Sequence, residues 1–308
     1  MYEIRICVTL RCNYMCSYCS QDGEGIFSEN PELSNEEIIN IITNMTALGI
    51  DSVRLTGGEP FCRVGLLHLA HEIKSISGIK KLSLVTNGSL ITDTVINQLS
   101  ENNPFDYISV SLDTLNALRY KEITKRNTFD TVIKNIVALT KIGIKTRINY
   151  VLSSKNVNES KKIVEFCIRE NIDLKVLDLY NDDENYVSPI VIENIVKEKG
   201  FSICKKHRLP GNLGNMMRVY RGYGIEIIIK DSCEGAVYSS EACKKCHRFP
   251  CQLGIVGAIL SHDGIVKMCS LGREKGINCF DSNDFEKIKR VLNTAKHMSN
   301  EWASVRFS

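Results

Sequence analysis

Residues 81–112 read KLSLVTNGSLITDTVINQLSENNPFDYISVSL, and their pattern decides the class of fold. Two short apolar runs, at 81–86 and 107–112, are typical of buried strands. The segment between them, 92–100, carries its apolar residues at helical spacing. A strand, a helix and a second strand in this order predict a βαβ unit, whose crossover makes the two strands parallel.

The same alternation runs through the first 180 residues of the 308-residue chain. The apolar runs predict six strands, at 3–10, 52–56, 81–86, 107–112, 145–152 and 174–179. Amphipathic stretches predict helices between the strands, near 35–48, 64–76, 92–100, 129–142 and 159–171. This order predicts an α/β fold with a parallel sheet, and a Rossmann-type open sheet and a full or partial barrel both fit it.

The alternation weakens after residue 181. Residues 182–216 are polar and mixed, with one expected helix near 190–199, and we predict that they connect two domains. Beyond them, short apolar runs predict strands at 226–229, 255–260 and 265–268, and a last helix is expected at 284–298. The expected division is therefore a βα domain at 1–181, a connection at 182–216 and a β-rich, Cys-rich domain at 217–308.

Composition excludes several classes of protein. The 39 Lys and Arg against 36 Asp and Glu leave a net charge of +3, which gives no reason to expect nucleic acid as a partner. No apolar run approaches the roughly 20 residues that span a bilayer, so no membrane partner is expected. The N-terminal residues lack a signal-peptide core, which predicts a cytoplasmic, reducing location. In such a compartment, 13 Cys point to metal ligands or catalytic thiols rather than to disulfides.

Three of these cysteines, Cys12, Cys16 and Cys19, follow directly on the first predicted strand. A structural zinc site needs four ligands, and the loop holds no fourth Cys or His. Three thiolates on one loop suit a four-iron cluster with one iron left open to another ligand. The spacing therefore favours a [4Fe-4S] cluster, with a zinc knuckle as the alternative.

The stretch Cys12-Asn13-Tyr14-Met15-Cys16-Ser17-Tyr18-Cys19 resembles the signature loop of the radical S-adenosylmethionine (SAM) superfamily. Leu55-Thr56-Gly57-Gly58-Glu59-Pro60 is similar to the Gly-Gly-Glu motif of that superfamily, and Thr86-Asn87-Gly88 and Ser109-Val110-Ser111-Leu112-Asp113 are similar to further elements in the same order. The resemblance points to the twitch/SPASM branch that contains the GTP 3′,8-cyclase of molybdenum cofactor biosynthesis. It implies a partial (β/α)6 TIM-like barrel with a small β-rich C-terminal twitch-like iron–sulfur domain.

The resemblance also implies how the cofactors are bound. SAM would chelate the open iron of the [4Fe-4S] cluster, and an external electron donor such as flavodoxin or ferredoxin would supply the electron that cleaves it. Gly57 and Gly58 would let backbone carbonyls approach the SAM ammonium, and Glu59 would stabilise their loop or accept from that ammonium. The full set of cofactor-binding residues implied in this way is Tyr18 near the adenine, Thr56, Gly57, Gly58, Glu59, Thr86, Asn87, and Ser111 with Arg147 at the methionine carboxylate.

A second group of cysteines lies in the C-terminal part, at Cys243, Cys246, Cys251 and Cys269. A CxxC pair followed by a hairpin and one more Cys resembles the auxiliary-cluster domain of twitch enzymes, which implies a second [4Fe-4S] cluster. Four ligands would make that cluster an electron relay, whereas three would leave an iron able to bind substrate. A zinc ribbon is the alternative by spacing alone.

The substrate is less well defined. The cyclase family has several closely spaced arginines after its CxxC pair, but this chain has only Arg248 there. Arg63, Arg218, Arg221 and Arg248 are the candidate residues for holding an anionic substrate. The expected function is hydrogen abstraction from a small nucleotide-like metabolite, bound between the clusters, that is cyclised, rearranged or oxidised. Modification of a ribosomal peptide and a non-catalytic zinc or iron–sulfur binding module are the alternatives.

Overall fold

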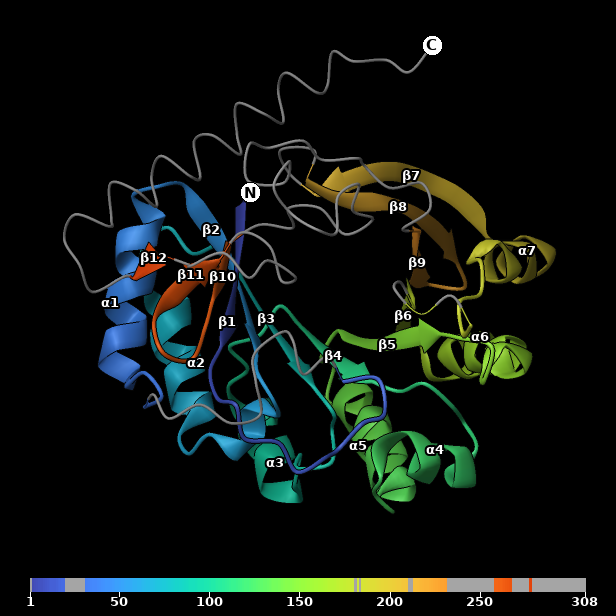
Figure 1. Ribbon diagram of the computed structural model, residues 1–308, viewed down its shortest axis with the longest axis horizontal. Helices are drawn as coiled ribbons and strands as arrows, with labels where there is room; N and C mark the ends of the chain where they lie inside the picture. Colours follow the sequence, from blue (N-terminus) through green and yellow to red (C-terminus); the bar gives the residue numbers. More distant parts are fainter. Residues whose placement is uncertain are drawn as a thin grey trace, which may run out of the picture.

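The computed structural model describes residues 2–19, 31–179, 182, 184–209, 213–231, 258–267 and 277–278. Within them one sheet of twelve strands has the order β12-β11-β10-β1-β2-β3-β4-β5-β6-β9-β8-β7 (Figure 1). The proposed second-cluster ligands Cys243, Cys246, Cys251 and Cys269 lie outside the described residues, as do Arg248 and the expected helix at 284–298. These expectations therefore stay predictions.

The bounds of the elements follow the predicted alternation closely. The strands are β1 (Tyr2–Cys7), β2 (Ile50–Thr56), β3 (Lys81–Thr86), β4 (Tyr107–Ser111), β5 (Thr146–Leu152), β6 (Asp173–Asp178), β7 (Ser202–Leu209), β8 (Leu213–Gly222), β9 (Ile225–Asp231), β10 (Ala258–Leu260), β11 (Ile265–Lys267) and β12 (Ile277–Asn278). The α-helices are α1 (Asn35–Thr46), α2 (Leu66–Ser75), α3 (Asp93–Glu101), α4 (Ala117–Thr124), α5 (Phe129–Lys141), α6 (Ser160–Glu170) and α7 (Ile190–Glu198).

Strands β1 to β6 are neighbours in chain order, and every pair among them is parallel. A doubly wound Rossmann sheet would reverse this order at a switch point, so the consecutive order excludes it. At the two ends, β1 pairs with β10 and β6 pairs with β9, so the six strands do not close on themselves. The fold is a partial barrel of the α/β class, as predicted.

Side chains alternate between the two faces of these strands. One set packs under the helices and is completely buried, as shown by Leu55, Leu84, Val110, Ile148 and Val176. In Figure 1 the helices α1 to α6 surround the outside of the curved sheet. The other set faces the inside of the curve, where the strands also carry polar and charged residues.

Four elements were not predicted: the strands β7, β8 and β12 and the helix α4. Strand β7 and the start of β8 lie within 182–216, where we expected only a connection with one helix. The exposed β7 residues include Lys205 and Lys206, so the strand lacks the apolar run of a buried strand. Helix α4 was missed because it buries only Tyr120 and Thr124, too few for a helical pattern. The expected domain boundaries stay a prediction.

No helix in the part of the chain that the structure describes combines the length and the apolar character needed to cross a bilayer.

The packing of the sheet predicts the effect of a truncation at its centre. Leu84 is completely buried on β3, so Leu84→Ala should lower the free energy of unfolding by about 2–5 kcal/mol. Val64 is 89% exposed, and Val64→Ala should change it by less than about 0.5 kcal/mol. Urea unfolding followed by circular dichroism measures both. Equal effects of the two variants would contradict this description of the core.

Candidate functional site

The predicted motifs meet at one edge of the sheet. The Cys12 loop follows β1, Gly57 and Gly58 follow β2, and Thr86 ends β3. In the parallel register Cys7 lies opposite Thr56, and Thr86 lies opposite Val110 of β4. The carboxyl ends of four neighbouring strands therefore bring these segments together, where barrels of this kind place their active sites.

The carboxylate of Glu59 links two of these strand ends. It is completely buried, and its Oε1 accepts hydrogen bonds from Thr86 Oγ1 at 2.7 Å and from the Phe61 amide at 3.1 Å. Its Oε2 accepts from the Asn87 amide at 2.6 Å. Burial raises the pKa of Glu59, against the effect of the three donors. Because both oxygens are used within the protein, the geometry favours the loop-stabilising role over contact with the SAM ammonium.

The two glycines let the loop after β2 lie against the backbone that leads to the Cys loop. The amide of Gly58 donates to Thr9 O, and that of Glu59 donates to Arg11 O, both at 2.8 Å. A Cβ on Gly57 would lie 2.4 Å from Thr9 O, and one on Gly58 would lie 2.5 Å from Arg11 O. Both positions therefore require glycine for contact with the protein itself. This use differs from the expected approach to SAM.

The Cys loop is held on both sides. On one side, Asn13 Oδ1 accepts from Asn87 Nδ2 and Asn13 Nδ2 donates to Ser89 Oγ, each at 2.9 Å. On the other side, the Met15 amide donates to Thr124 O at 3.3 Å and the Ser17 amide donates to Ile123 O at 2.9 Å. The loop is therefore suspended between the end of β3 and helix α4.

A third attachment uses Tyr18, which lies between the second and third cysteines. Its hydroxyl donates to Asp113 Oδ2, and Asp113 Oδ1 accepts from the Val151 amide at 2.8 Å. Burial raises the pKa of Asp113 to about 6. The Tyr18 side chain is 38% exposed, so its ring keeps a surface for contact with a ligand.

The donor set of the loop fits an iron–sulfur cluster. Cys12 and Cys19 are exposed and Cys16 is half-buried, so the three thiols are not packed in the hydrophobic core and are accessible to a metal. Burial raises the pKa of all three, that of Cys16 to about 12, so a metal must displace their protons on binding. Among the described residues no three His, Cys, Asp or Glu side chains converge on a single metal ion. A four-iron cluster instead needs one thiolate for each of three irons, which this loop offers.

The inside of the barrel carries a group of basic residues that the sequence analysis missed, apart from Arg147. We call it the cationic cluster: Arg5 on β1, Arg54 on β2, Lys81 on β3, Arg147 on β5 and Lys175 on β6. The ring of Tyr107 lies at its centre. The guanidinium of Arg147 is 4.5 Å and Lys81 Nζ is 4.9 Å from the centre of that ring, and Arg54 Nη2 donates to its hydroxyl at 2.8 Å.

The cationic cluster is not neutralised by the carboxylates around it. Glu3 pairs with Arg54 at 2.7 Å and with Arg5 at 3.6 Å, and Asp173 lies 3.7 Å from Arg147. Five basic side chains thus face two acidic ones. Burial, then the nearby Arg54, Arg5 and Arg147, hold the pKa of Lys175 well below its ordinary value. Such an excess of positive charge favours the binding of an anion.

Unused donors support this interpretation. The Nε atoms of Arg5, Arg54 and Arg147 are buried, and within the described residues they have no hydrogen-bond acceptor. Buried donors in folded proteins are nearly always bonded, so these atoms are open to an acceptor from a ligand or from water. The register places Arg147 opposite Ser109, whereas Ser111 lies opposite Asn149. Arg147 therefore lies deeper in the barrel than Ser111, its expected partner at the methionine carboxylate.

The arginines expected to bind substrate are placed apart. Arg63 is buried and donates to Val8 O at 2.8 Å, to Leu33 O at 2.7 Å and to Asn35 Oδ1 at 2.8 Å, which makes it a link between loops. Arg218 is buried between Glu193 and Asp231, at 3.3 Å from each. The structure does not bring Arg63 and Arg218 into one pocket.

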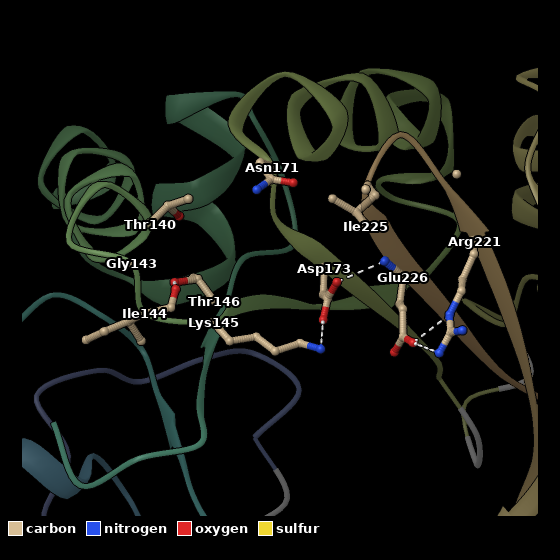
Figure 2. A pocket seen from close by; sticks show the side chains of 12 residues that line it. Thr140, Gly143, Ile144, Lys145, Thr146, Asn171, Asp173, Arg221, Ile225 and Glu226 are labelled. Atoms are coloured by element: carbon tan, nitrogen blue, oxygen red, sulfur yellow. Dashed lines mark hydrogen bonds and ion pairs between the residues drawn. The ribbon is translucent and has the colours of Figure 1, made fainter.

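Arg221 lies at the opposite edge of the sheet from the Cys loop. Its Nη2 is 2.7 Å from Glu226 Oε1, beside a cavity of about 510 Å³ at the amino ends of β5, β6 and β9. Figure 2 shows this pair, with Lys145 reaching toward Asp173 nearby. Both basic residues here have an acidic partner, and Asp173 also lies beside Arg147 of the cationic cluster.

A comparison with known families agrees with this geometry. Residues 6–167 match the model of the Radical SAM superfamily. The chain belongs to the radical SAM superfamily. The match covers the barrel from β1 to α6, and with it the Cys loop and the Gly-Gly-Glu motif, so the predicted family is confirmed. The family is one of enzymes that use a [4Fe-4S] cluster with SAM.

Comparison with individual proteins describes this relation in more detail than the superfamily match. This radical SAM protein is 35% identical over 203 residues to the GTP 3′,8-cyclase of Clostridium perfringens (strain SM101), covering 64% of this chain and 62% of that protein. It is 31% identical over 306 residues to the probable GTP 3′,8-cyclase of Sulfurisphaera tokodaii, covering 94% of this chain and 89% of that protein. The chain thus spans less than two thirds of the Clostridium relative, and nearly all of the second.

The solved structure of Streptococcus suis SuiB bound to S-adenosylmethionine is similar to this radical SAM fold, with a TM-score of 0.65. The alignment covers 94% of this chain and 67% of SuiB at 16% identity. At this identity the likeness shows the fold alone, and it supports the partial barrel.

The contact of Gly58 with the backbone predicts a test of the radical SAM site. Gly58→Ala should push the Arg11 carbonyl away and destabilise the docked loop by about 1–3 kcal/mol, so SAM binding should weaken about tenfold or more. In Gly49→Ala the new Cβ meets no atom within 4 Å, although its φ of +90° also strains alanine. Iron content and equilibrium dialysis of SAM measure the effect. Equal SAM binding by both variants would contradict the docking argument.

The raised pKa of Asp113 predicts a pH dependence of stability. The folded value of about 6 exceeds the ordinary 3.8, so the stabilising contribution is complete below about pH 4 and is lost as the pH rises through 6. The free energy of unfolding, relative to Asp113→Asn, should therefore fall by about 2 kcal/mol between about pH 4 and pH 7. Urea unfolding of the cluster-free protein measures it, with Asp130→Asn as an exposed control. A difference that does not change with pH would refute the prediction.

Proposed function

We propose that this protein cleaves SAM reductively at the Cys12, Cys16 and Cys19 loop and abstracts a hydrogen atom from a nucleoside triphosphate, as a GTP 3′,8-cyclase. The observation that carries this proposal is the cationic cluster inside the barrel. Relatives named as GTP 3′,8-cyclases support the choice of nucleotide. The proposed reaction class is therefore a radical cyclisation.

The cationic cluster suits a chain of phosphates. Guanidinium groups bind phosphate oxygens in pairs, and three arginines with two lysines come from five different strands around one space. Lys81 is the first residue of β3 and Arg147 the second of β5, so the cluster lies toward the amino ends of the strands, below the Cys loop at their carboxyl ends. Phosphates held there would leave the sugar and base to extend toward the loop.

The protein supplies binding and orientation for the cofactor. When bound, a [4Fe-4S] cluster with SAM supplies the carbon-centred radical that removes a hydrogen atom from the substrate. Glu59, the two glycines and Asn87 hold the Cys loop in place, and in this proposal the exposed face of Tyr18 contacts the adenine. We propose that Thr56, Thr86 and Ser111, at the same edge of the sheet, complete the SAM pocket.

The proposal also includes a second iron–sulfur cluster, bound by the C-terminal part of the chain. In it, Cys243, Cys246, Cys251 and Cys269 hold a second [4Fe-4S] cluster, with Arg248 next to the CxxC pair. The overall alignment with the Sulfurisphaera relative, which spans 94% of this chain, supports a C-terminal region of related type. The number of Cys ligands decides whether that cluster binds substrate or carries electrons.

A peptide substrate is the second candidate. SuiB has been solved bound to its precursor peptide, and the likeness of this chain to that structure has a TM-score of 0.66 at 16% identity. The cationic cluster weighs against this candidate, because a peptide supplies no row of closely spaced anionic groups to match it.

Anaerobic reconstitution with iron and sulfide, followed by dithionite, SAM and GTP, tests the proposal. We expect 5′-deoxyadenosine and a cyclised nucleotide in GTP-dependent amounts, and much less of both with guanosine in place of GTP. A fully loaded protein that forms no 5′-deoxyadenosine under these conditions would overturn the enzyme assignment. Product formation from guanosine at the same rate would overturn the role of the phosphates.

Lys175 offers a test of the cationic cluster that separates binding from stability. Its buried charge is held among other cations, so Lys175→Met should preserve or raise the free energy of unfolding. The same variant should weaken GTP binding about 10–100-fold, since it removes a charge-assisted bond to phosphate.

Arg221→Gln is the matched control, because Arg221 is exposed and paired with Glu226. Equilibrium binding of GTP and urea unfolding measure the two quantities. Loss of GTP binding in Arg221→Gln but not in Lys175→Met would place the anion site elsewhere.

A further inference from the structure

Beside the Cys loop the structure has an exposed surface that the proposed reaction does not use. We call it the α4 patch: Met15 in the loop, Leu118 and Lys121 on α4, and Lys125 and Arg126 directly after α4. Met15 is 66% exposed and Leu118 is 75% exposed, so both apolar side chains are open to a partner. The basic residues of the patch are exposed as well.

The members of the α4 patch lie on two segments that are bonded to each other. Leu118, Lys121 and Lys125 are spaced by three and four residues, so they lie along one side of the helix. The helix contacts the loop directly, since the Met15 amide donates to Thr124 O and Arg126 Nε donates to Asn13 O. In Figure 1 the dark-blue segment after β1 passes between α3 and α4. The patch thus adjoins the loop that carries Cys12 and Cys16.

The patch carries positive charge without local compensation. Between Leu118 and Asn127 the chain has four basic residues and one acidic residue, Glu122. Arg119 forms an ion pair with Glu159. In the described part of the chain, Lys121, Lys125 and Arg126 have no carboxylate oxygen within 4.0 Å, so their charges are available to a partner.

We propose that the α4 patch is the docking surface for an acidic one-electron carrier protein of the flavodoxin type. The inference rests on the proposed function, because each reductive cleavage of SAM consumes one electron that must enter near the Cys loop. Basic side chains around exposed Met and Leu match an acidic partner with an apolar centre. The hydroquinone anion of the carrier loses one electron and becomes the neutral semiquinone, and the cluster charge falls from 2+ to 1+. No proton moves and no covalent bond changes in this step.

Charge reversal on the patch tests the inference. The double variant Lys121→Glu with Lys125→Glu leaves the Cys loop and its hydrogen bonds to α4 unchanged. With photoreduced flavodoxin at low salt, reduction of the loaded cluster should slow about tenfold or more, because steering by opposite charges is lost. The bleaching of the visible absorbance of the cluster measures this rate. The rate should also lose most of its dependence on salt concentration.

Two controls make the result specific. Lys161→Glu with Lys162→Glu reverses two exposed charges on α6 and should leave the flavodoxin rate within about twofold of the parent. Dithionite needs no docking surface, so both double variants should form 5′-deoxyadenosine with it as the parent does. If the parent protein forms no 5′-deoxyadenosine with dithionite, the proposed function is contradicted. The docking inference is judged separately, from the rate at which flavodoxin reduces the cluster.

The outcomes divide clearly. The docking inference is supported if the α4 variant alone shows slower reduction of its cluster by flavodoxin, and if neither SAM nor GTP restores the rate. An unchanged flavodoxin rate in the α4 variant, or an equal loss in the α6 control, overturns it. A calorimetric titration of flavodoxin into the loaded protein gives an independent readout, and equal affinity for the parent and the α4 variant would also overturn the inference.

Discussion

The buried carboxylate of Glu59 is the contact on which the site depends. It accepts three hydrogen bonds from residues that lie after two different strands, and it fixes the loop whose glycines touch the backbone before Cys12. The position of the three thiols is therefore set by backbone contacts and by one acid, and not by side chains of the thiol loop alone. A cofactor that bridges protein and ligand needs such a preformed support, because small displacements of its ligands change its geometry.

The basic residues inside the barrel repel one another, and this repulsion lowers the stability of the fold. Arg5, Arg54 and Lys175 are close to one another in a region of low solvent access, and burial with mutual repulsion lowers the pKa of Arg5 and Lys175. The apolar packing of the surrounding sheet and helices offsets this unfavourable contribution to stability. If the nucleotide of the proposed function binds there, its phosphates would reduce the repulsion and accept hydrogen bonds, and binding of the nucleotide would then raise stability.

The sequence predicted the parts of the protein that follow from local pattern. The strands 81–86 and 107–112 and the thiol spacing at Cys12 were clear because each signal lies within a few residues. The cationic cluster was not found, since Arg5, Arg54 and Lys175 are single charges in apolar strands and lie far apart in sequence. In the sequence these basic residues alternate with buried apolar residues, which indicates that they lie on the opposite face of each strand. Only the strand order shows that they share the inner face of one sheet. Arg63 is the opposite case, since it lies next to a motif and its guanidinium donates to backbone carbonyls, while its expected contact with substrate stays a prediction.

The pairing of β1 with β10 has a consequence for the synthesis of the protein. Ile4 lies opposite Ala258, so one edge of the first strand stays without its partner until 254 further residues have been made. At about 5–20 residues per second, this interval is about 13–50 s. Throughout it, an open strand edge and the adjoining thiol loop emerge from the ribosome before the sheet that shields them is complete. Insertion of iron is therefore best timed after release of the chain, and the nascent protein is the form most exposed to aggregation and to oxidation of its cysteines.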